Sequence, residues 1–331
     1  MFVFVLGNGF SIDLIKLMEK EHLLQTGLID LENLFAEGDS FSISSCQQGY
    51  LSHCNSLKAQ GVSTAISKEE SKKLIDKFIT SYNIYARWRT NNPDQLVRMG
   101  IGNKYIELYN ELIDYLKKLF LHYNQLVSDD ALQKLVQDEK VPVISLIKKA
   151  IASHEHIKII TYNYDVFLER LLDVAKIPYV ISGFEEVRQN IEIFKPHGSI
   201  SFDVKCARKY SIWEGLSLNI SCLKVTKNLN GNYDLCAIIP PYGDANLSTY
   251  NWCRSIRDNI LRLKLSNCDK IILFGISYGE IDRPEIDSIL LKAQEETGIW
   301  YINPKPSEQL CFILESLFKN YNHYDSLNER N

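Results

Sequence analysis

The chain has 331 residues, of which 45% are hydrophobic and 24% are charged, and its formal net charge is -4. This composition is that of an ordinary globular protein and excludes a disordered, collagen-like or low-complexity chain. Because the charges include no basic excess, we expect no direct binding to nucleic acid.

The cysteines and the apolar runs set the expected environment. The eight cysteines are scattered and no two have CxxC spacing, so neither a zinc site of that kind nor a disulfide framework is expected. No apolar run approaches the roughly 20 residues of a membrane helix, and the apolar start lacks the basic flank of a signal peptide. We therefore expect a cytoplasmic protein without a membrane contact or a bound metal.

The N-terminal residues predict a strand, a glycine-rich turn and a helix in succession. Residues 2–6 are apolar, residues 7–11 read Gly-Asn-Gly-Phe-Ser, and a helical pattern covers residues 12–20. A strand, a glycine turn and a helix form the opening unit of nucleotide-binding α/β folds.

A mostly helical insert is predicted after this unit. It begins with residues 23–62, which are rich in Ser, Gly and Gln and predict loops with short helical pieces. Ser67 and Glu70 then form a capping-box pattern at the start of a helix, and two further helices are predicted at residues 106–120 and 143–153. Their apolar stripes are expected to be packing surfaces rather than ligand sites.

Strand and helix patterns alternate through the rest of the chain. Short apolar runs predict strands at residues 158–161, 179–181, 191–194, 237–239, 270–274 and 299–302, and helical patterns cover residues 166–174, 251–265 and 283–295. This alternation predicts a Rossmann-like α/β fold with a mostly parallel sheet and a helical insert or cap. Asn230-Gly231 suits a type I′ turn, so a hairpin is expected between residues 223–227 and 233–239.

These elements predict the domain organisation. Residues 1–20 and 157–320 are expected to form the Rossmann-like domain, residues 21–156 the helical insert, and residues 321–331 a polar, frayed tail.

The first candidate motif is the glycine turn. Gly7, Asn8 and Gly9 stand where a strand ends and a helix begins, so backbone N–H groups favour an anion there. Glycine lets a pyrophosphate approach the main chain, and Ser11 could add a hydroxyl donor. The alternative is a tight turn that simply needs glycine.

Two further motifs follow predicted strands, and the carboxyl ends of parallel strands face the ligand in open α/β sheets. In Thr161-Tyr162-Asn163-Tyr164-Asp165, Asn163 suits a ribose diol or a water molecule, while Asp165 could accept from a carboxamide or cap the following helix. The alternative for both residues is that they simply form a turn. In the His197-Gly198 pair, the imidazole could act as a general base near neutral pH, although a lone histidine is often structural.

The last two motifs follow the strands nearest the C-terminus. Gly275, Ser277 and Gly279 match the GxSxG pattern of serine hydrolases, but the only later histidine, His323, lies in the predicted tail. We therefore favour a phosphate or ribose contact by Gly275 and Ser277. Asn303 could reach an adenosine ribose, or it could form a simple turn beside the prolines that follow.

These motifs, in this order, resemble the sirtuin-like NAD-binding fold. The sirtuin pattern Gly-Ala-Gly-x-Ser is matched at residues 7–11, Thr-Gln-Asn-Ile-Asp at 161–165, His-Gly at 197–198, Gly-x-Ser at 275–277, and the late strand ending in Asn at 303. The chain lacks the four zinc cysteines of protein-deacylating sirtuins and the Gly-Ile-Pro-Asp-Phe-Arg segment after the first motif. In its Thr-x-Asn-Tyr-Asp form, its missing zinc cysteines and its large helical insert, it resembles the sirtuin-like domains of bacterial anti-phage defence. The opening at residues 6–10 also resembles abortive-infection proteins of a related kind.

The resemblance implies a function as well as a fold. It implies an NAD hydrolase in which NAD is the substrate, His197 is the base and Asn163 orients the nicotinamide ribose and the water. It places the dinucleotide against Gly7, Asn8, Gly9, Ser11, Thr161, Asp165, Gly198, Gly275, Ser277 and Asn303. A sensing module that binds NAD or an ADP-ribose derivative without turnover is the alternative, and the missing zinc cysteines disfavour a deacylase. A homo-oligomer and an ATPase partner from the same defence operon are the expected associations.

Overall fold

The computed structural model describes residues 1–42, 48–91, 103–184, 189–204, 219–227, 229, 236–240, 251–279 and 283–326. The chain divides into two compact units, which are treated separately below. The first contains residues 1–25, 127–199 and 252–331, and the second contains residues 26–126 and 200–251.

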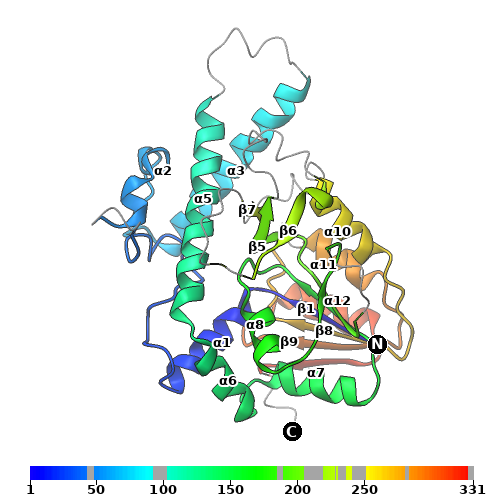
Figure 1. Ribbon diagram of the computed structural model, residues 1–331. Coiled ribbons are helices and arrows are strands. Elements are labelled where there is room, and N and C mark those ends of the chain that lie inside the picture. The colour runs from blue at the N-terminus through cyan, green and yellow to red at the C-terminus, as the bar shows by residue number, and fades with distance from the viewer. Residues whose placement is uncertain are drawn as a thin grey trace. The chain divides into compact units, whose positions relative to one another are not determined.

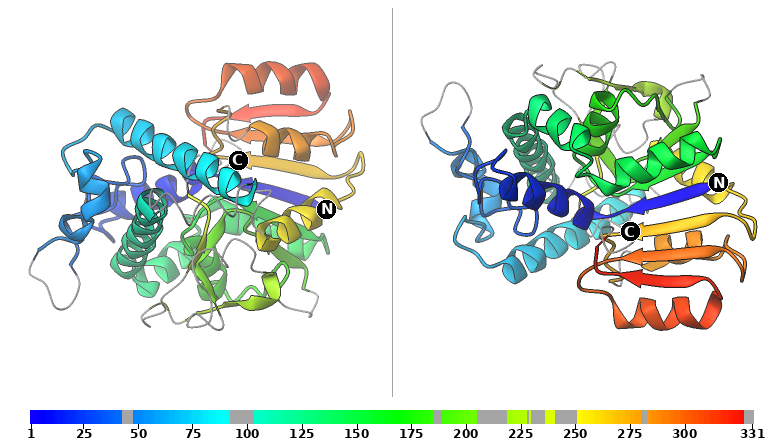
Figure 2. Two further views of the ribbon diagram at one scale, coloured as in Figure 1. Left: turned by 90° about the horizontal axis from the view of Figure 1, so that it is seen from above. Right: turned by 90° about the horizontal axis from the view of Figure 1, so that it is seen from below.

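The first unit is built on a seven-stranded sheet in which every recorded strand pair is parallel. Its strands are β1 (Phe2–Leu6), β2 (Ile157–Thr161), β3 (Val180–Ile181), β4 (Ile191–Phe194), β8 (Lys270–Phe274), β9 (Gly298–Ile302) and β10 (Tyr321–Tyr324). The helices that flank the sheet in Figures 1 and 2 are α1 (Asn8–Lys20), α6 (Asp129–Gln137), α7 (Pro142–Ala152), α8 (Phe167–Val174), α10 (Asn251–Leu261), α11 (Arg283–Leu290) and α12 (Glu308–Leu317). The predicted α/β class with a parallel sheet is confirmed.

The strand order explains where a ligand would bind. The order is β10-β9-β8-β1-β2-β4-β3, so the chain extends the sheet in both directions from β1. Without the edge strand β3, this is the order of the dinucleotide-binding Rossmann sheet, whose direction of winding reverses between two central strands. Here the reversal lies between β1 and β8. In open α/β sheets, ligands bind beyond the carboxyl ends of the strands at such a point.

The central strands are apolar because they are buried on both faces. Residues 3–6 of β1 are fully buried, and β2 and β8 pair with β1 on either side. A strand covered by helices on both faces reads as a continuous apolar run, which is the pattern that predicted it. The register aligns Leu6 with Thr161 and with Phe274, so the motifs that follow these three strands start side by side.

The C-terminal tail is shorter than expected. Residues 321–324 form β10, which pairs in parallel with β9, so the prediction of a frayed tail from residue 321 was wrong for these four residues. β10 lies at the edge of the sheet, and its side chains at Asn322 and His323 are exposed. Because an edge strand of this kind carries no apolar run, the sequence pattern did not reveal it. α12, which precedes β10, was not predicted either.

The boundary of the insert also differs from the expectation. Residues 127–156, which include α6 and α7, belong to the first unit, while residues 200–251 belong to the second. The reason is visible in the contacts of α8, where the Arg170 guanidinium donates to Asp129 (Nε to Oδ1 2.9 Å) and to the carbonyl of Val127. These bonds attach the start of α6 to the sheet unit.

The second unit contains long helices and a small sheet. Its elements are a short 3₁₀ helix (Tyr50–His53), α2 (Asn55–Ala59), α3 (Lys68–Asn91), α5 (Asn103–Leu126), another 3₁₀ turn (Ile220–Cys222), β5 (Gly198–Val204), β6 (Leu223–Val225) and β7 (Cys236–Ile238). The predicted capping box is confirmed, since the Ser67 amide donates to Glu70 Oε2 (3.0 Å) and the Glu70 amide donates to Ser67 Oγ (3.2 Å).

The predicted hairpin was wrong. The order of the small sheet is β6-β5-β7, so β5 separates the two strands that we expected to pair, and β5 and β6 are antiparallel. The proposed turn at Asn230-Gly231 lies outside the described residues. β5 was missed because its polar residues Ser199, Ser201 and Asp203, although buried, interrupt the apolar run.

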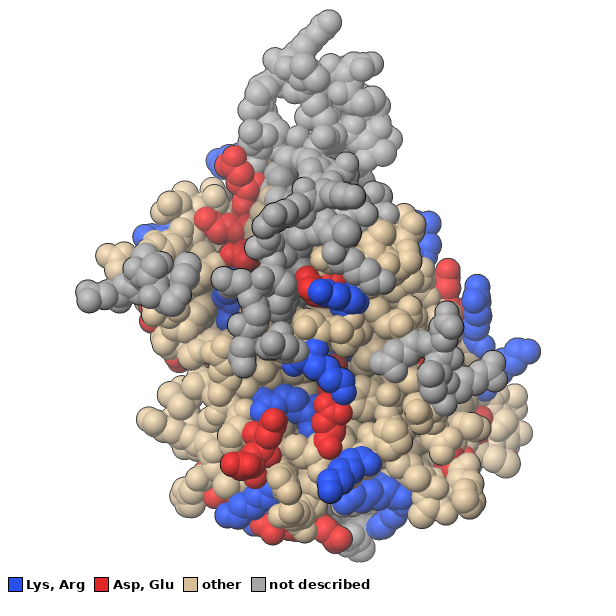
Figure 3. All heavy atoms as spheres, viewed as in Figure 1, with Lys and Arg blue, Asp and Glu red and all other residues tan. Residues whose placement is uncertain are grey.

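The surface and the helices add two observations. On the face shown in Figure 3, acidic and basic side chains lie interspersed over the coloured part of the molecule.

Among the helices of the described residues, none has both the length and the apolar composition needed to cross a bilayer.

Candidate active site

The β1–α1 turn and the β8 turn are packed backbone against backbone. The Gly7 amide donates to the Phe274 carbonyl (2.9 Å), and the Gly9 amide donates to the Gly275 carbonyl (3.1 Å). A Cβ added to Gly275, whose φ is 62°, would lie 2.4 Å from the Cα of Gly9. Glycine is therefore required here by the close approach of two chain segments.

This packing changes the role expected of the first motif. The amides of Gly7 and Gly9, which we expected to point toward a pyrophosphate, donate to carbonyls within the protein. α1 begins at Asn8 rather than at residue 12, so Ser11 lies in the first turn of the helix and is fully buried. Asn8, in contrast, is exposed at the first position of the helix. Of this motif, Asn8 is thus the residue whose side chain is exposed.

The close packing gives a first prediction. Changing Gly275 to alanine should lower the free energy of unfolding by at least about 2 kcal/mol, because the new Cβ clashes with backbone and the left-handed conformation is strained. Gly61→Ala is the matched control, since Gly61 also has a positive φ (91°) but its added Cβ would have no neighbour within 4 Å. Urea unfolding of both variants measures the difference. A Gly275→Ala variant no less stable than Gly61→Ala would contradict the packing argument.

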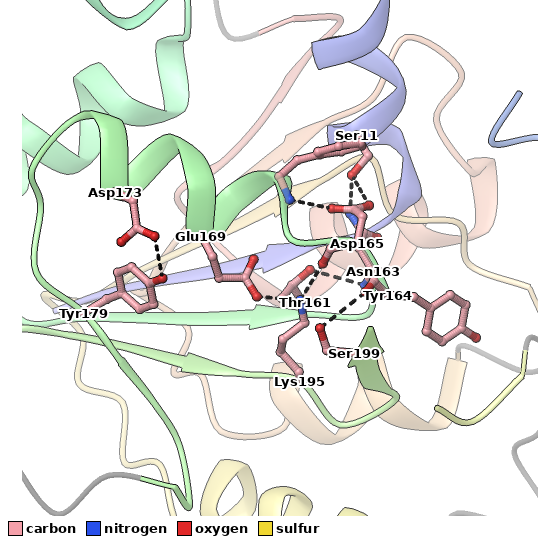
Figure 4. A network of polar contacts seen from close by, with 11 residues as sticks. Ser11, Thr161, Asn163, Tyr164, Asp165, Glu169, Asp173, Tyr179, Lys195 and Ser199 are labelled. Carbon is pink, nitrogen blue, oxygen red and sulfur yellow. Dashed lines mark hydrogen bonds and ion pairs between the residues drawn. The ribbon is translucent and has the colours of Figure 1, made fainter. Parts of the chain in front are cut away.

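A buried polar network joins the first motif to the second (Figure 4). The Asn163 amide Nδ2 donates to the Gly7 carbonyl (3.0 Å) and to Ser11 Oγ (2.9 Å). Ser11 Oγ in turn donates to Asp165 Oδ2 (2.7 Å). The single hydrogen of the Ser11 hydroxyl is therefore directed to Asp165, and both amide hydrogens of Asn163 have acceptors. Among the described residues, no hydrogen bond occupies the Oδ1 oxygen of Asn163, which can accept two.

Asp165 directly precedes Val166, the N-cap residue of α8, and accepts a hydrogen bond at the start of that helix. Its Oδ1 accepts from the Phe167 amide (3.1 Å) at the first residue of α8, which is the capping role weighed for it. Burial raises the pKa of Asp165, against the opposing effects of Lys195, the Ser11 hydroxyl and the Phe167 amide. Thr161 is also buried, and its Oγ1 accepts from the backbone N–H of Asn163 (3.3 Å). In this structure Asp165, Ser11 and Thr161 hold the segment around Asn163 in place.

A buried ion pair lies beside this network and fixes the start of the third motif. Lys195 Nζ lies 2.7 Å from Glu169 Oε1 and donates to the Asp165 carbonyl (2.6 Å). The Lys195 side chain is 0% exposed and that of Glu169 is 8% exposed. The pair therefore connects the end of β4 to the first turn of α8, as Figure 4 shows.

His197 is presented by a tight turn at the end of β4. The Gly198 amide donates to the Lys195 carbonyl (3.0 Å), and the φ of Gly198 is 82°, a conformation that favours glycine. The half-buried His197 ring lies 4.9 Å from the ring of Tyr162, centroid to centroid. His197 and Asn163 thus stand on neighbouring segments at the same edge of the sheet.

His197 has a carboxylate partner that sequence reasoning missed. Its Nε2 lies 2.9 Å from Oε2 of Glu285, a buried residue in the first turn of α11. Burial alone would raise the pKa of Glu285, but His197 and Arg257 together lower it. The pattern of α11 held a signal, because Glu285 lies four residues before Ile289 and so on the same, buried face of the helix. No role was predicted for that face of α11.

The fourth and fifth motifs meet each other at the end of β8. Ser277 is exposed there. The side-chain Nδ2 of Asn303 donates to the Ile276 carbonyl (3.0 Å) and to the Tyr301 hydroxyl (3.2 Å). Asn303 Oδ1 also accepts from the Lys305 amide (3.0 Å), which is the simple turn weighed as its alternative role. Asn303 thus joins the ends of β8 and β9.

The fold and the site together define a class: an α/β protein with Rossmann strand order and a histidine–carboxylate pair at the carboxyl edge of its sheet. Within the described ranges, no group of three or more His, Cys, Asp or Glu side chains is arranged to hold a metal ion. No protein-family model matches the sequence, and a search of curated proteins found no match either.

Proposed function

We propose that this chain binds NAD at the carboxyl edge of the sheet and hydrolyses the bond between nicotinamide and ribose. The observation that carries the proposal is the convergence at this edge of two chain segments, one with Asn163 and the other with His197 paired to Glu285. The strand order supports it, because the reversal between β1 and β8 is where dinucleotides bind in sheets of this type. The resemblance of the motifs to sirtuin-like NAD hydrolases specifies the ligand.

The proposed chemistry needs a base and a positioning group. The C1′–N bond breaks with its electron pair going to the nicotinamide ring, which leaves as a neutral molecule and needs no acid. Water attacks C1′, its proton passes to His197, and the product is ADP-ribose. The Oδ1 oxygen of Asn163 would accept from a ribose hydroxyl or from the water. We assign the exposed Asn8 and Ser277 to the pyrophosphate side.

Positioning would supply much of the rate, since holding the water and the sugar in line turns a bimolecular step into a unimolecular one. The network of Asn163, Ser11 and Asp165 supports this, because both amide hydrogens of Asn163 are fixed and its Oδ1 is held in one orientation. In the cell, such an activity would deplete cytoplasmic NAD, which fits a role in abortive anti-phage defence.

A direct assay tests the proposal. The purified full chain is incubated with NAD over a range of protein concentrations, because an oligomer is expected, and nicotinamide and ADP-ribose are measured by chromatography. Equimolar release of the two products is the expected result, unchanged by an acetyl-lysine peptide. Calorimetry with NAD runs in parallel. Binding without products would replace hydrolysis by sensing, and neither binding nor products would overturn the proposal.

A further inference from the structure

Glu285, the partner of His197, is buried and has charged or chargeable neighbours on both carboxylate oxygens. Its side chain is 6% exposed, and its Oε2 faces His197 Nε2 at 2.9 Å. Its other oxygen, Oε1, has no hydrogen-bond partner within the described part of the chain and lies 3.9 Å from Arg257 Nε. Burying a carboxylate is costly unless it is paired, and the two oxygens of Glu285 face an imidazole and a guanidinium.

We infer that Glu285 is the positioning residue of His197: it holds the Nε2–H of the imidazole, fixes the orientation of the ring and stabilises the imidazolium. This inference rests on the proposed function, in which His197 is the base. The logic is that of other base–carboxylate pairs, in which a buried carboxylate selects the tautomer and does not itself take the proton.

The contact sets the direction of proton transfer. A neutral imidazole carries one N–H and one lone pair. With the hydrogen on Nε2, directed to Glu285, the basic nitrogen is Nδ1. The proton of the attacking water would therefore be taken by Nδ1, and the positive charge that then develops on the ring would lie 2.9 Å from a carboxylate.

The other groups around Glu285 support an ionised carboxylate. Arg257 and Cys253 face it from α10, and His197 faces it from the end of β4. Burial, with a further contribution from the charge of Glu285, raises the pKa of the Cys253 thiol to about 12, so this neighbour is neutral. Among the described residues, the groups recorded against the Glu285 carboxylate that carry or can take a positive charge are Arg257 and His197. Both favour the carboxylate form that the inference requires.

Glu285→Gln is the decisive variant, because it keeps the size of the side chain and removes its charge. Glu308→Gln, at an exposed position in the first turn of α12, is the matched control. NMR of ¹⁵N-labelled histidine side chains, with the His197 signals identified by their loss in His197→Gln, reports the tautomer and the titration without any NAD. We expect the Nε2–H tautomer in the wild type and in Glu308→Gln. In Glu285→Gln the titration midpoint of His197 should move to lower pH.

Kinetics add a second readout. In Glu285→Gln, kcat for nicotinamide release should fall at least about tenfold while KM for NAD stays within about twofold, since the carboxylate acts on the base and not on the substrate. The acidic limb of the pH profile should move to lower pH, and Glu285→Asp should recover part of the rate. An unchanged His197 tautomer and titration in Glu285→Gln would overturn the inference. A wild type that releases no nicotinamide would instead reject the proposed function, while the NMR result would still decide whether Glu285 positions His197.

Discussion

Replacing His197 with glutamine should lower the rate of nicotinamide release by about 10²–10⁴-fold, because this is the usual contribution of a general base. Glutamine removes the basic nitrogen but can still donate a hydrogen bond to Glu285. The turn at Gly198 and the ion pair of Lys195 do not involve the imidazole, so the variant should fold. The rate is measured by chromatography at saturating NAD, and the fold by circular dichroism and thermal unfolding.

His156→Gln is the control for this experiment. His156 is exposed and directly precedes β2, so it lies at the amino end of the strand whose carboxyl end carries Asn163. Its replacement should leave the rate unchanged. A His197→Gln protein that keeps more than half of the wild-type rate would remove His197 from the mechanism, and equal losses in both variants would point to a general effect on folding.

The strands that build the candidate site could be predicted because their burial leaves a strong pattern. β1 matches its prediction residue for residue, and β2, β8 and β9 match to within one residue, since each is an apolar run buried on nearly all sides. The polar motifs could be located from the same pattern, because each begins where an apolar run ends. Their meeting at one edge is a property of parallel sheets and needed no further information.

The pairing of side chains within the site could not be predicted in this way. Asn163 and Ser11 are 152 residues apart, and His197 and Glu285 are 88 residues apart. The type of a residue shows what it can donate or accept, but not which of several nearby groups it meets. Ser11 illustrates this, since its hydroxyl was expected to bind a ligand and instead donates to Asp165. Glu285 was missed for the same reason. The helical pattern shows that Glu285 shares a face with apolar residues, but not which side chain it meets there.

The buried charges under the site have a structural consequence that the sequence also concealed. Lys195 lies directly before the Pro196-His197 pair, and its ammonium is the only cation recorded against the Glu169 carboxylate among the described residues. The second oxygen of Glu169, Oε2, is buried without a hydrogen-bond partner in the same part of the structure. Glu169 therefore depends on this one lysine, and Lys195 also opposes the effect of burial, which raises the pKa of Asp165.

Lys195→Met should lower the free energy of unfolding by about 3–5 kcal/mol, because removing one partner of a buried ion pair leaves the other charge uncompensated. Methionine fills a similar volume, so the loss is not explained by a cavity. The Asp165 carbonyl loses its donor at the same time, which adds to the cost. Urea unfolding at pH 7 measures the change, and Lys319→Met, which removes an exposed ion pair with Glu296, should leave stability nearly unchanged.

The double variant Lys195→Met/Glu169→Leu distinguishes the effect of this ion pair on stability from its effect on the position of the Asn163 segment. With both charges removed, most of the lost stability should return, because a buried ion pair replaced by apolar groups is often neutral or stabilising. If the refolded double variant then releases nicotinamide at the wild-type rate, the pair serves stability alone. We expect a slower rate, since the ammonium of Lys195 also holds the Asp165 carbonyl and so the segment that carries Asn163. A Lys195→Met protein as stable as Lys319→Met would contradict the burial of this charge.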